Sequence, residues 1–188
     1  LVGSEMCIRD RFDKEYGLYE NHEILGEKGH FITSPLVSKH FSHCIAKHYI
    51  KESTFDTIVE LGGGDASLAC DLLFYLKDKK ELPNKYIFFE KSDYLIKKQK
   101  SIISEKSISK LVDISWVSDL KDLPNEAFII SNELFDCIPT DIIMHVPGGY
   151  QKAYINDNYK LDWKKLNLKN ESDITDLGLQ KNIPKNYI

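Results

Sequence analysis

Hydrophobic residues in this chain occur as short apolar runs that alternate with segments of helical periodicity. Four runs are predicted strands, because they are rich in β-branched and aromatic residues and each ends at glycine or a polar residue. These runs cover residues 57–61, 86–89, 114–117 and 127–131. Apolar residues at helical spacing follow the first two runs, so the pattern predicts an α/β fold with a mostly parallel sheet and helices on both faces.

Before the first strand, Thr33, Ser34 and Pro35 form a helix-start signal. Ser34 at the cap position accepts from free N–H groups, and proline loses no hydrogen bond at the first helical position. Apolar residues at helical spacing follow, and we expect this helix to continue to about residue 50. Beyond Pro139 the pattern changes to short strands, and the runs 150–155 and 159–163 predict a β-hairpin.

The pattern divides the chain into four parts. Residues 1–11 lack any periodicity and resemble translated adapter sequence, so we expect them to be non-native. Residues 12–55 are a predicted helical lead-in, residues 56–146 a Rossmann-like core, and residues 147–188 the hairpin and the start of an incomplete C-terminal region. Because no closing element follows the hairpin, we expect the native protein to continue beyond residue 188.

Composition narrows the class of partner. The formal net charge of −4 gives no electrostatic reason to bind nucleic acid or an anionic membrane, and no apolar run is long enough for membrane insertion. Four cysteines without a CxxC pair favour a reducing compartment. We therefore expect the partners to be small molecules and proteins.

Candidate chemistry gathers where the predicted strands end. Ligands of open parallel sheets bind beyond the carboxyl ends of the strands, near the point where the strand order reverses. We therefore expect the residues at these ends to meet at one edge of the sheet. They are Glu60, Gly62, Gly63, Gly64, Glu90, Asp119, Asn132 and Glu133.

The glycine run after the first strand lets a ligand approach the backbone where the next helix begins. A dinucleotide site would require the GxGxxG pattern, but Ser67 stands at the third glycine position and Asp65 would repel a phosphate. A cofactor without phosphates fits better, although the glycines could also serve only a tight turn. Glu90 stands where a carboxylate accepts both ribose hydroxyls of an adenosine group, or it is simply a solvated acid.

Four blocks of sequence resemble the MidA-type family of class I methyltransferases, with order and spacing that agree from about residue 16 to 163. Residues 16–19 and 29–38 are similar to the family's aromatic pair and GDFxTSPEIS signature. Further on, residues 59–64 are similar to VELGPG, residues 89–99 to VExSPxLRxxQ, and residues 132–139 to NEFFDALP.

The resemblance implies a Rossmann-like fold that binds S-adenosylmethionine. It adds Thr33 and Ser34 to the cofactor contacts at the strand ends, although capping explains these two residues equally well. It also implies that Trp116 and Asp119 wall and hydrogen-bond the adenine, the alternative being a core tryptophan and a turn aspartate. The mitochondrial members of the family are protein arginine methyltransferases of complex I assembly. By analogy we expect a protein substrate, such as a complex I subunit, and a cytoplasmic location in a bacterium or the mitochondrial matrix in a eukaryote.

Two acids after the fourth run are the candidate catalytic groups. Glu133 and Asp136 lie three residues apart, and in a helical turn this spacing puts both carboxylates on one face. With Asn132 they would orient the acceptor, because a guanidinium is not deprotonated by a carboxylate at neutral pH. The alternative is that Asn132 caps a short helix whose positive N-terminal end the two acids complement.

Other functions have weaker support from the sequence. His30 and Leu36 replace acids of the family signature, so a catalytically silent assembly factor that binds the cofactor is one alternative. An NAD-linked oxidoreductase is another, but GxGxxG and a hydride-transfer site are missing. His40 and His43 stand at helical spacing without a third ligand, which favours a solvated helix face and no metal site.

Overall fold

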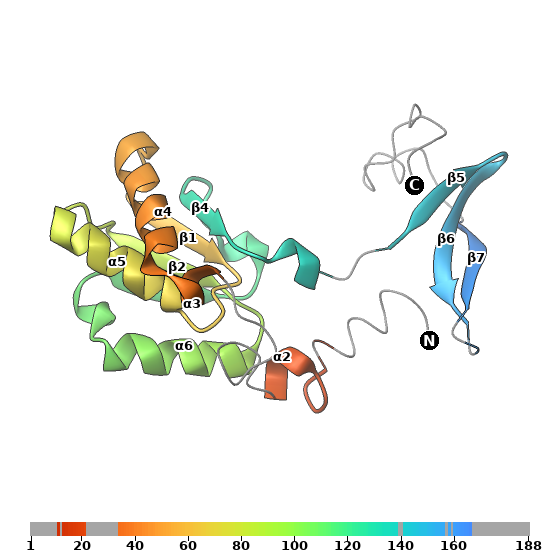
Figure 1. Ribbon diagram of the computed structural model, residues 1–188, viewed down its shortest axis with the longest axis horizontal. Coiled ribbons are helices and arrows are strands. Elements are labelled where there is room, and N and C mark those ends of the chain that lie inside the picture. The colour runs from red at the N-terminus through yellow and green to blue at the C-terminus, as the bar shows by residue number, and fades with distance from the viewer. Residues whose placement is uncertain are drawn as a thin grey trace. The chain divides into compact units, whose positions relative to one another are not determined.

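The computed structural model describes residues 11, 13–21, 34–138, 141–156, 158 and 160–166 (Figure 1). The chain divides into two compact units between Ile138 and Pro139, and each unit is described by itself. Thr33, His30, most of the segment expected to be non-native and everything after residue 166 lie outside the described residues.

The first unit holds a four-stranded parallel sheet in the order β3-β2-β1-β4. All four predicted strands are present, with bounds within one residue of the prediction. They are β1 (Thr57–Leu61), β2 (Lys85–Phe89), β3 (Asp113–Val117) and β4 (Phe128–Ser131). The chain moves outward from β1 to β3 and then returns to the other side of β1, so the strand order reverses between β1 and β4.

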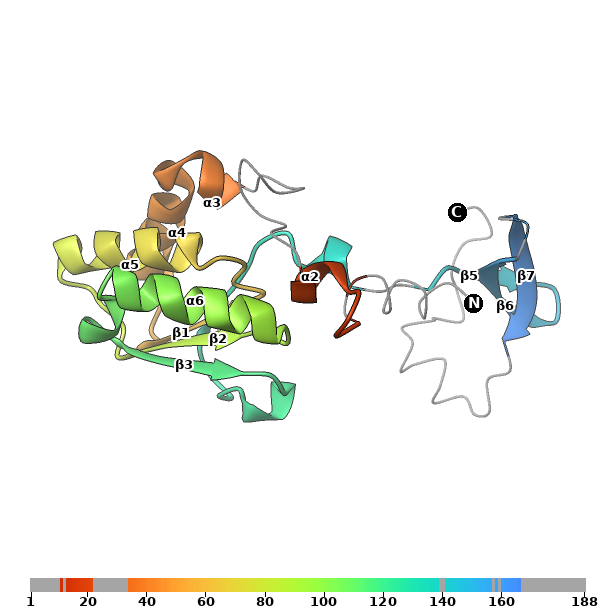
Figure 2. The same cartoon turned by 90° about the horizontal axis from the view of Figure 1, so that it is seen from below.

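The long helices pack on one face of this sheet. They are α4 (Lys39–Glu52), α5 (Ser67–Lys79) and α6 (Asp93–Glu105). Because both β-α-β connections run in the same direction, right-handed crossovers place α5 and α6 on the same side, as Figure 2 shows. The Rossmann-like α/β class is confirmed, while the described residues place no helix on the second face, where Ile129 is 61% exposed.

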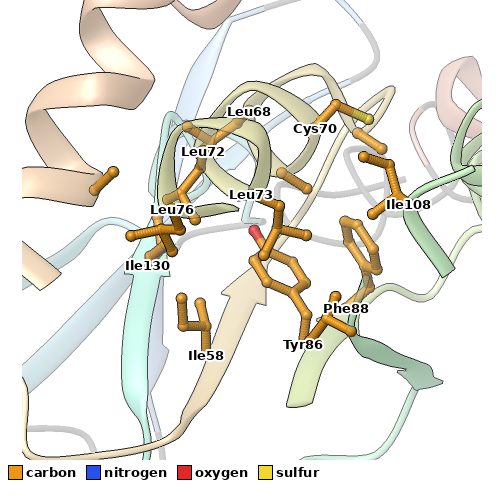
Figure 3. Close-up of a cluster of buried hydrophobic side chains, with 14 of the residues drawn as sticks. Ile58, Leu68, Cys70, Leu72, Leu73, Leu76, Tyr86, Phe88, Ile108 and Ile130 are labelled. Carbon is orange, nitrogen blue, oxygen red and sulfur yellow. The ribbon is translucent and has the colours of Figure 1, made fainter. Parts of the chain in front are cut away.

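The hydrophobic core lies between the sheet and these helices (Figure 3). Side chains alternate between the two faces of a strand, and the even-numbered residues of the four strands face the helices. Ile58, Tyr86, Phe88 and Ile130 thus pack against buried residues of α4 and α5. The helix residues in this cluster include Ala46, Tyr49, Leu68, Leu72, Leu73 and Leu76. The core therefore fixes the sheet whose carboxyl edge carries the candidate site.

The predicted continuous helix from residue 34 to 50 is interrupted. A short helix, α3 (Ser34–Val37), ends at Ser38, whose backbone is extended and whose hydroxyl accepts from the His40 N–H group at 3.2 Å to cap α4. Ser34 is therefore the first residue of α3 and is exposed, and Val37 is 73% exposed instead of facing the core. Helical periodicity correctly predicts α4, but Ser38 inside the pattern caps a new helix and separates α4 from α3.

Short helices connect the remaining elements of the first unit. Before α3 lies α2 (Leu18–Asn21), and three 3-10 turns follow α6. These turns are η1 (Ile108–Lys110), η2 (Leu120–Asp122) and η3 (Phe135–Cys137).

The second unit is a three-stranded antiparallel sheet of β5 (Ile143–Val146), β6 (Gly149–Ile155) and β7 (Leu161–Leu166). The predicted hairpin is β6–β7, and its second strand begins two residues later than expected. The Asn156 side chain explains this, because its Oδ1 accepts from the N–H groups of Asn158 and Lys160 at 3.0 Å each and closes the turn. None of the helices in the described part of the chain has the length and apolar character needed to cross a membrane.

Candidate functional site

The carboxyl ends of the four parallel strands meet at one edge of the first unit's sheet. Two backbone hydrogen bonds join neighbouring ends: Gly62 N–H donates to the Phe89 carbonyl, and Glu90 N–H donates to the Val117 carbonyl, each with an N–O distance of 3.0 Å. The glycine loop after β1 therefore lies beside Glu90, and Glu90 lies beside the end of β3. The sequence predicted this grouping from the strand ends alone.

The protein's own structure requires two glycines of this loop, Gly62 for its backbone conformation and Gly63 for its packing. Gly62 has φ +72°, and a Cβ there would lie 2.9 Å from Leu134 Cδ1. A Cβ at Gly63 would lie 2.5 Å from Phe88 Cδ1, well inside contact distance. The fold itself thus explains two glycines that the sequence suggested were there for close ligand contact. Approach of a ligand to this backbone stays a prediction.

The same loop presents unused donors. Within the described residues, the N–H groups of Gly63, Gly64 and Asp65 have no acceptor. Asp65 Oδ1 accepts from the N–H group of Ser67, the first residue of α5, at 3.0 Å. A carboxylate already occupies this helix start, which opposes a phosphate there and agrees with the choice of a cofactor without phosphates.

Glu90 is buried, so its interpretation as a solvated strand-end acid is wrong. Its Oε1 accepts from the N–H groups of Lys91 and Ser92 at 2.9 and 3.0 Å. Its Oε2 accepts only a longer bond of 3.4 Å from the Gln99 amide. Burial raises the pKa of Glu90 in spite of these bonds. Oε2 is therefore the oxygen with capacity left for a ligand hydroxyl.

Glu60 lies beneath the glycine loop, on the helix-facing side of β1. It is 3% exposed, and Tyr86 donates its hydroxyl to Glu60 Oε2 at 2.8 Å. A Cβ at Gly63 would lie 3.3 Å from the same oxygen. Burial raises the pKa of Glu60 to about 7. The Glu60 carboxyl group thus packs against the glycine loop from the core side. Direct contact of Glu60 with a cofactor stays a prediction.

Trp116 packs against the core and Asp119 lies in a turn, as expected if neither residue contacts adenine. The Trp116 ring stacks on Phe88 with centroids 5.5 Å apart and packs against the core. Its Nε1 donates to Gln99 Oε1 at 2.9 Å. Asp119 is exposed and caps η2 by accepting from the Lys121 N–H group at 3.0 Å. Contact of Trp116 and Asp119 with adenine stays a prediction.

The candidate catalytic segment after β4 is not arranged as the helical spacing suggested. Glu133 has φ +50°, in the left-handed region, so it precedes the turn η3 instead of sharing a helix face with Asp136. The cap residue of η3 is Leu134, without a side-chain cap bond, so capping by Asn132 is also wrong. Glu133 is exposed at the carboxyl end of β4, and the side chain of Asp136 lies outside the described residues.

Residues near the N-terminus reach this edge as well, which sequence reasoning missed. The Tyr19 carbonyl accepts from the Ser92 hydroxyl at 2.6 Å, and the Tyr19 hydroxyl lies 2.7 Å from Cys137 Sγ. The helix α2 thus contacts both the loop after β2 and the turn after β4. The partners of Tyr19 are 73 and 118 residues away in sequence, so no local pattern could show them.

Gln99 is the second residue that the site reasoning missed. It is 0% exposed in α6 and bonds to the glycine loop, to Glu90 and to Trp116. The sequence carried two signals for it: a glutamine at a buried position of an amphipathic helix, and the final glutamine of the motif that residues 89–99 resemble. Among the described residues no group of histidine, cysteine, aspartate and glutamate side chains is placed to hold a metal ion.

Comparison with known proteins matches this chain to a methyltransferase family. Residues 44–186 match the model of a family described as "Putative S-adenosyl-L-methionine-dependent methyltransferase". The mitochondrial protein arginine methyltransferase NDUFAF7 is 28% identical in Rattus norvegicus and 30% identical in Homo sapiens, each over 167 residues. Each match covers 74% of this chain but 38% of the relative, so the chain spans about two fifths of these proteins' length.

A solved structure shows the same fold. It is a COG1565 superfamily member from Burkholderia thailandensis bound to S-adenosyl-homocysteine, with a TM-score of 0.70 and 19% identity. The likeness covers 95% of this chain and 48% of that protein. Because the family model matches more than half of the residues, this chain belongs to the MidA-type family of S-adenosylmethionine-dependent methyltransferases.

Proposed function

We propose that this chain binds S-adenosylmethionine along the carboxyl edge of its parallel sheet and transfers the methyl group to a protein arginine. The observation that carries the proposal is the pairing of unused N–H donors in the glycine loop with the buried Glu90 carboxylate on the next strand. Glu90 Oε2 has capacity to accept from a ribose hydroxyl, and the loop N–H groups can donate to acceptors of the cofactor.

The residues present fit this cofactor. Its sulfonium supplies an activated methyl group, so the protein's task is to align the acceptor with it. On transfer, a nitrogen–carbon bond would form at the guanidinium, the methyl–sulfur bond would break to leave a thioether, and the nitrogen would lose its proton to solvent. Glu133 is exposed at the end of β4, on the same sheet edge, and its carboxylate would hold and orient the guanidinium.

The choice of a protein arginine as acceptor is supported by the names of the NDUFAF7 relatives. Those relatives are mitochondrial, and we extend the proposal to a respiratory complex I subunit as the substrate by family analogy. A methyl-labelled cofactor, an arginine-containing peptide and the same peptide with lysine at the arginine positions give a direct test. We expect label on the arginine peptide.

Glu133→Gln separates acceptor binding from cofactor binding. We expect this variant to transfer methyl groups more slowly while its affinity for S-adenosyl-homocysteine stays that of the wild type. Glu126→Gln is the matched control, because Glu126 is an exposed glutamate before the amino end of the same strand. Cofactor binding without transfer to either peptide would contradict the proposal and favour the catalytically silent assembly factor.

A further inference from the structure

The side chain of Gln99 connects three elements of the cofactor edge. Its Nε2 donates to the Gly64 carbonyl at 3.0 Å and to Glu90 Oε2 at 3.4 Å. Its Oε1 accepts from Trp116 Nε1 at 2.9 Å. The three partners come from the loop after β1, the end of β2 and strand β3, whereas Gln99 itself lies in α6.

These partners leave the amide only one orientation. An indole N–H group is a donor only, so it must face the amide oxygen, and the amide NH2 group must then face Gly64 and Glu90. Both atoms on that side, a carbonyl and a carboxylate oxygen, are acceptors. Each hydrogen-bonding group of Gln99 therefore has a matching partner, and rotation of the amide by 180° would break all three bonds.

The orientation of the Gln99 amide determines the position of Glu90 Oε2, the carboxylate oxygen that can still accept from a ligand hydroxyl. Oε1 is held by two backbone N–H groups of its own loop. Oε2 receives no donor from the described residues except Gln99. The direction of Oε2, and its separation from the glycine loop, therefore depend on the Gln99 amide.

We propose that Gln99 is a positioning residue for the cofactor: it aims Glu90 Oε2 at the ribose hydroxyls and holds the glycine loop at a fixed separation from Glu90. This inference rests on the proposed function, because it assigns Glu90 to the ribose. A purely structural glutamine would instead stabilise the fold without any link to Glu90.

A double-mutant cycle distinguishes these two roles. Affinity for S-adenosyl-homocysteine is measured by calorimetry on the 188-residue chain and on the variants Gln99→Leu, Glu90→Ala and the double variant. Loss of a hydrogen bond to a charged group corresponds to about tenfold in affinity, so we expect Gln99→Leu to weaken binding about tenfold when Glu90 is present. With Glu90→Ala already in place, we expect Gln99→Leu to have less than about a twofold further effect.

Trp116→Phe is a second variant that leaves the buried amide in the protein. It keeps an aromatic ring to stack on Phe88 and removes the N–H donor that orients Gln99, together with part of the volume of the indole ring. We expect weaker binding of S-adenosyl-homocysteine, again only when Glu90 is present. Ser101→Ala, at an exposed position of the same helix, is the control and should bind as the wild type does.

The outcomes separate the failure of this inference from the failure of the proposed function. If the wild type does not bind S-adenosyl-homocysteine, or if Glu90→Ala binds as well as the wild type, the proposed cofactor site is wrong and the role of Gln99 falls with it. If Glu90→Ala weakens binding but Gln99→Leu and Trp116→Phe weaken it equally with and without Glu90, the cofactor site stands and the positioning role is refuted.

Discussion

Replacement of Glu60 by glutamine should make the first unit more stable, and increasingly so as the pH rises. Burial raises the pKa of this carboxyl to about 7 from its ordinary value of 4.5, with a partly opposing effect from the Tyr86 hydroxyl. Between pH 4.5 and 7, Glu60 is therefore protonated in the folded protein and ionised in the unfolded chain. The contribution of the protonated Glu60 carboxyl to the free energy of unfolding is fully present below pH 4.5 and is lost as the pH rises through 7.

The magnitude follows from the two pKa values. Each unit corresponds to 1.36 kcal/mol, so ionised Glu60 costs the folded state about 3 kcal/mol above pH 7. Glutamine has the shape of the protonated acid, and its carbonyl can still accept from the Tyr86 hydroxyl. We expect Glu60→Gln to raise the free energy of unfolding by about 1 kcal/mol at pH 5 and by about 3 kcal/mol at pH 8.

Urea unfolding followed by far-UV circular dichroism between pH 5 and 8 measures this difference. Glu105→Gln, which removes an exposed carboxylate from α6, serves as the control and should change stability by less than about 0.5 kcal/mol at every pH. A difference between Glu60→Gln and wild type that does not grow with pH, or a variant that is less stable at pH 8, would refute the reasoning about the buried carboxyl.

Three further changes test the local structure. Gly63→Ala places a Cβ 2.5 Å from Phe88, so urea unfolding should show a loss of about 1–3 kcal/mol, and an unchanged midpoint would contradict the packing argument. Ser38→Ala removes the cap of α4 and should cost about 1 kcal/mol, whereas Ser101→Ala should not. Glu133→Gly replaces a residue with a left-handed backbone by one that adopts this conformation freely, so the protein should be as stable or up to about 1 kcal/mol more stable. Methyl transfer should fall. A clear loss of stability would show a structural role for this side chain.

The sequence predicted the sheet well because local features define its strands. Each strand is a short apolar run that ends at glycine or a polar group, and the parallel arrangement then brings those ends together. The same reasoning predicts Glu90 beside the glycine loop. Where one element stops and another starts depends on single side chains, and Ser38 divided a helix that periodicity alone extended to residue 50.

The parts that the sequence did not predict depend on contacts between distant residues. Gln99 bonds to partners 9, 17 and 35 residues away, and the amide's role follows only from their arrangement in space. The sequence suggests ligand contact or a tight turn for the glycines at positions 62 and 63, whereas a left-handed backbone requires glycine at 62 and the Phe88 ring fills the space beside 63. Glu133 was placed on a helix face from its spacing to Asp136, but its left-handed backbone puts it before the turn.

Calorimetric titration of the chain with S-adenosylmethionine, with NADH as the competing ligand, tests the central claim most directly. The site predicts saturable binding of S-adenosylmethionine, about tenfold or more weaker in Glu90→Ala and unchanged in the exposed control Glu126→Ala, together with no binding of NADH. Binding of NADH, or an affinity for S-adenosylmethionine that Glu90→Ala does not alter, would contradict the cofactor site at the carboxyl edge of the sheet.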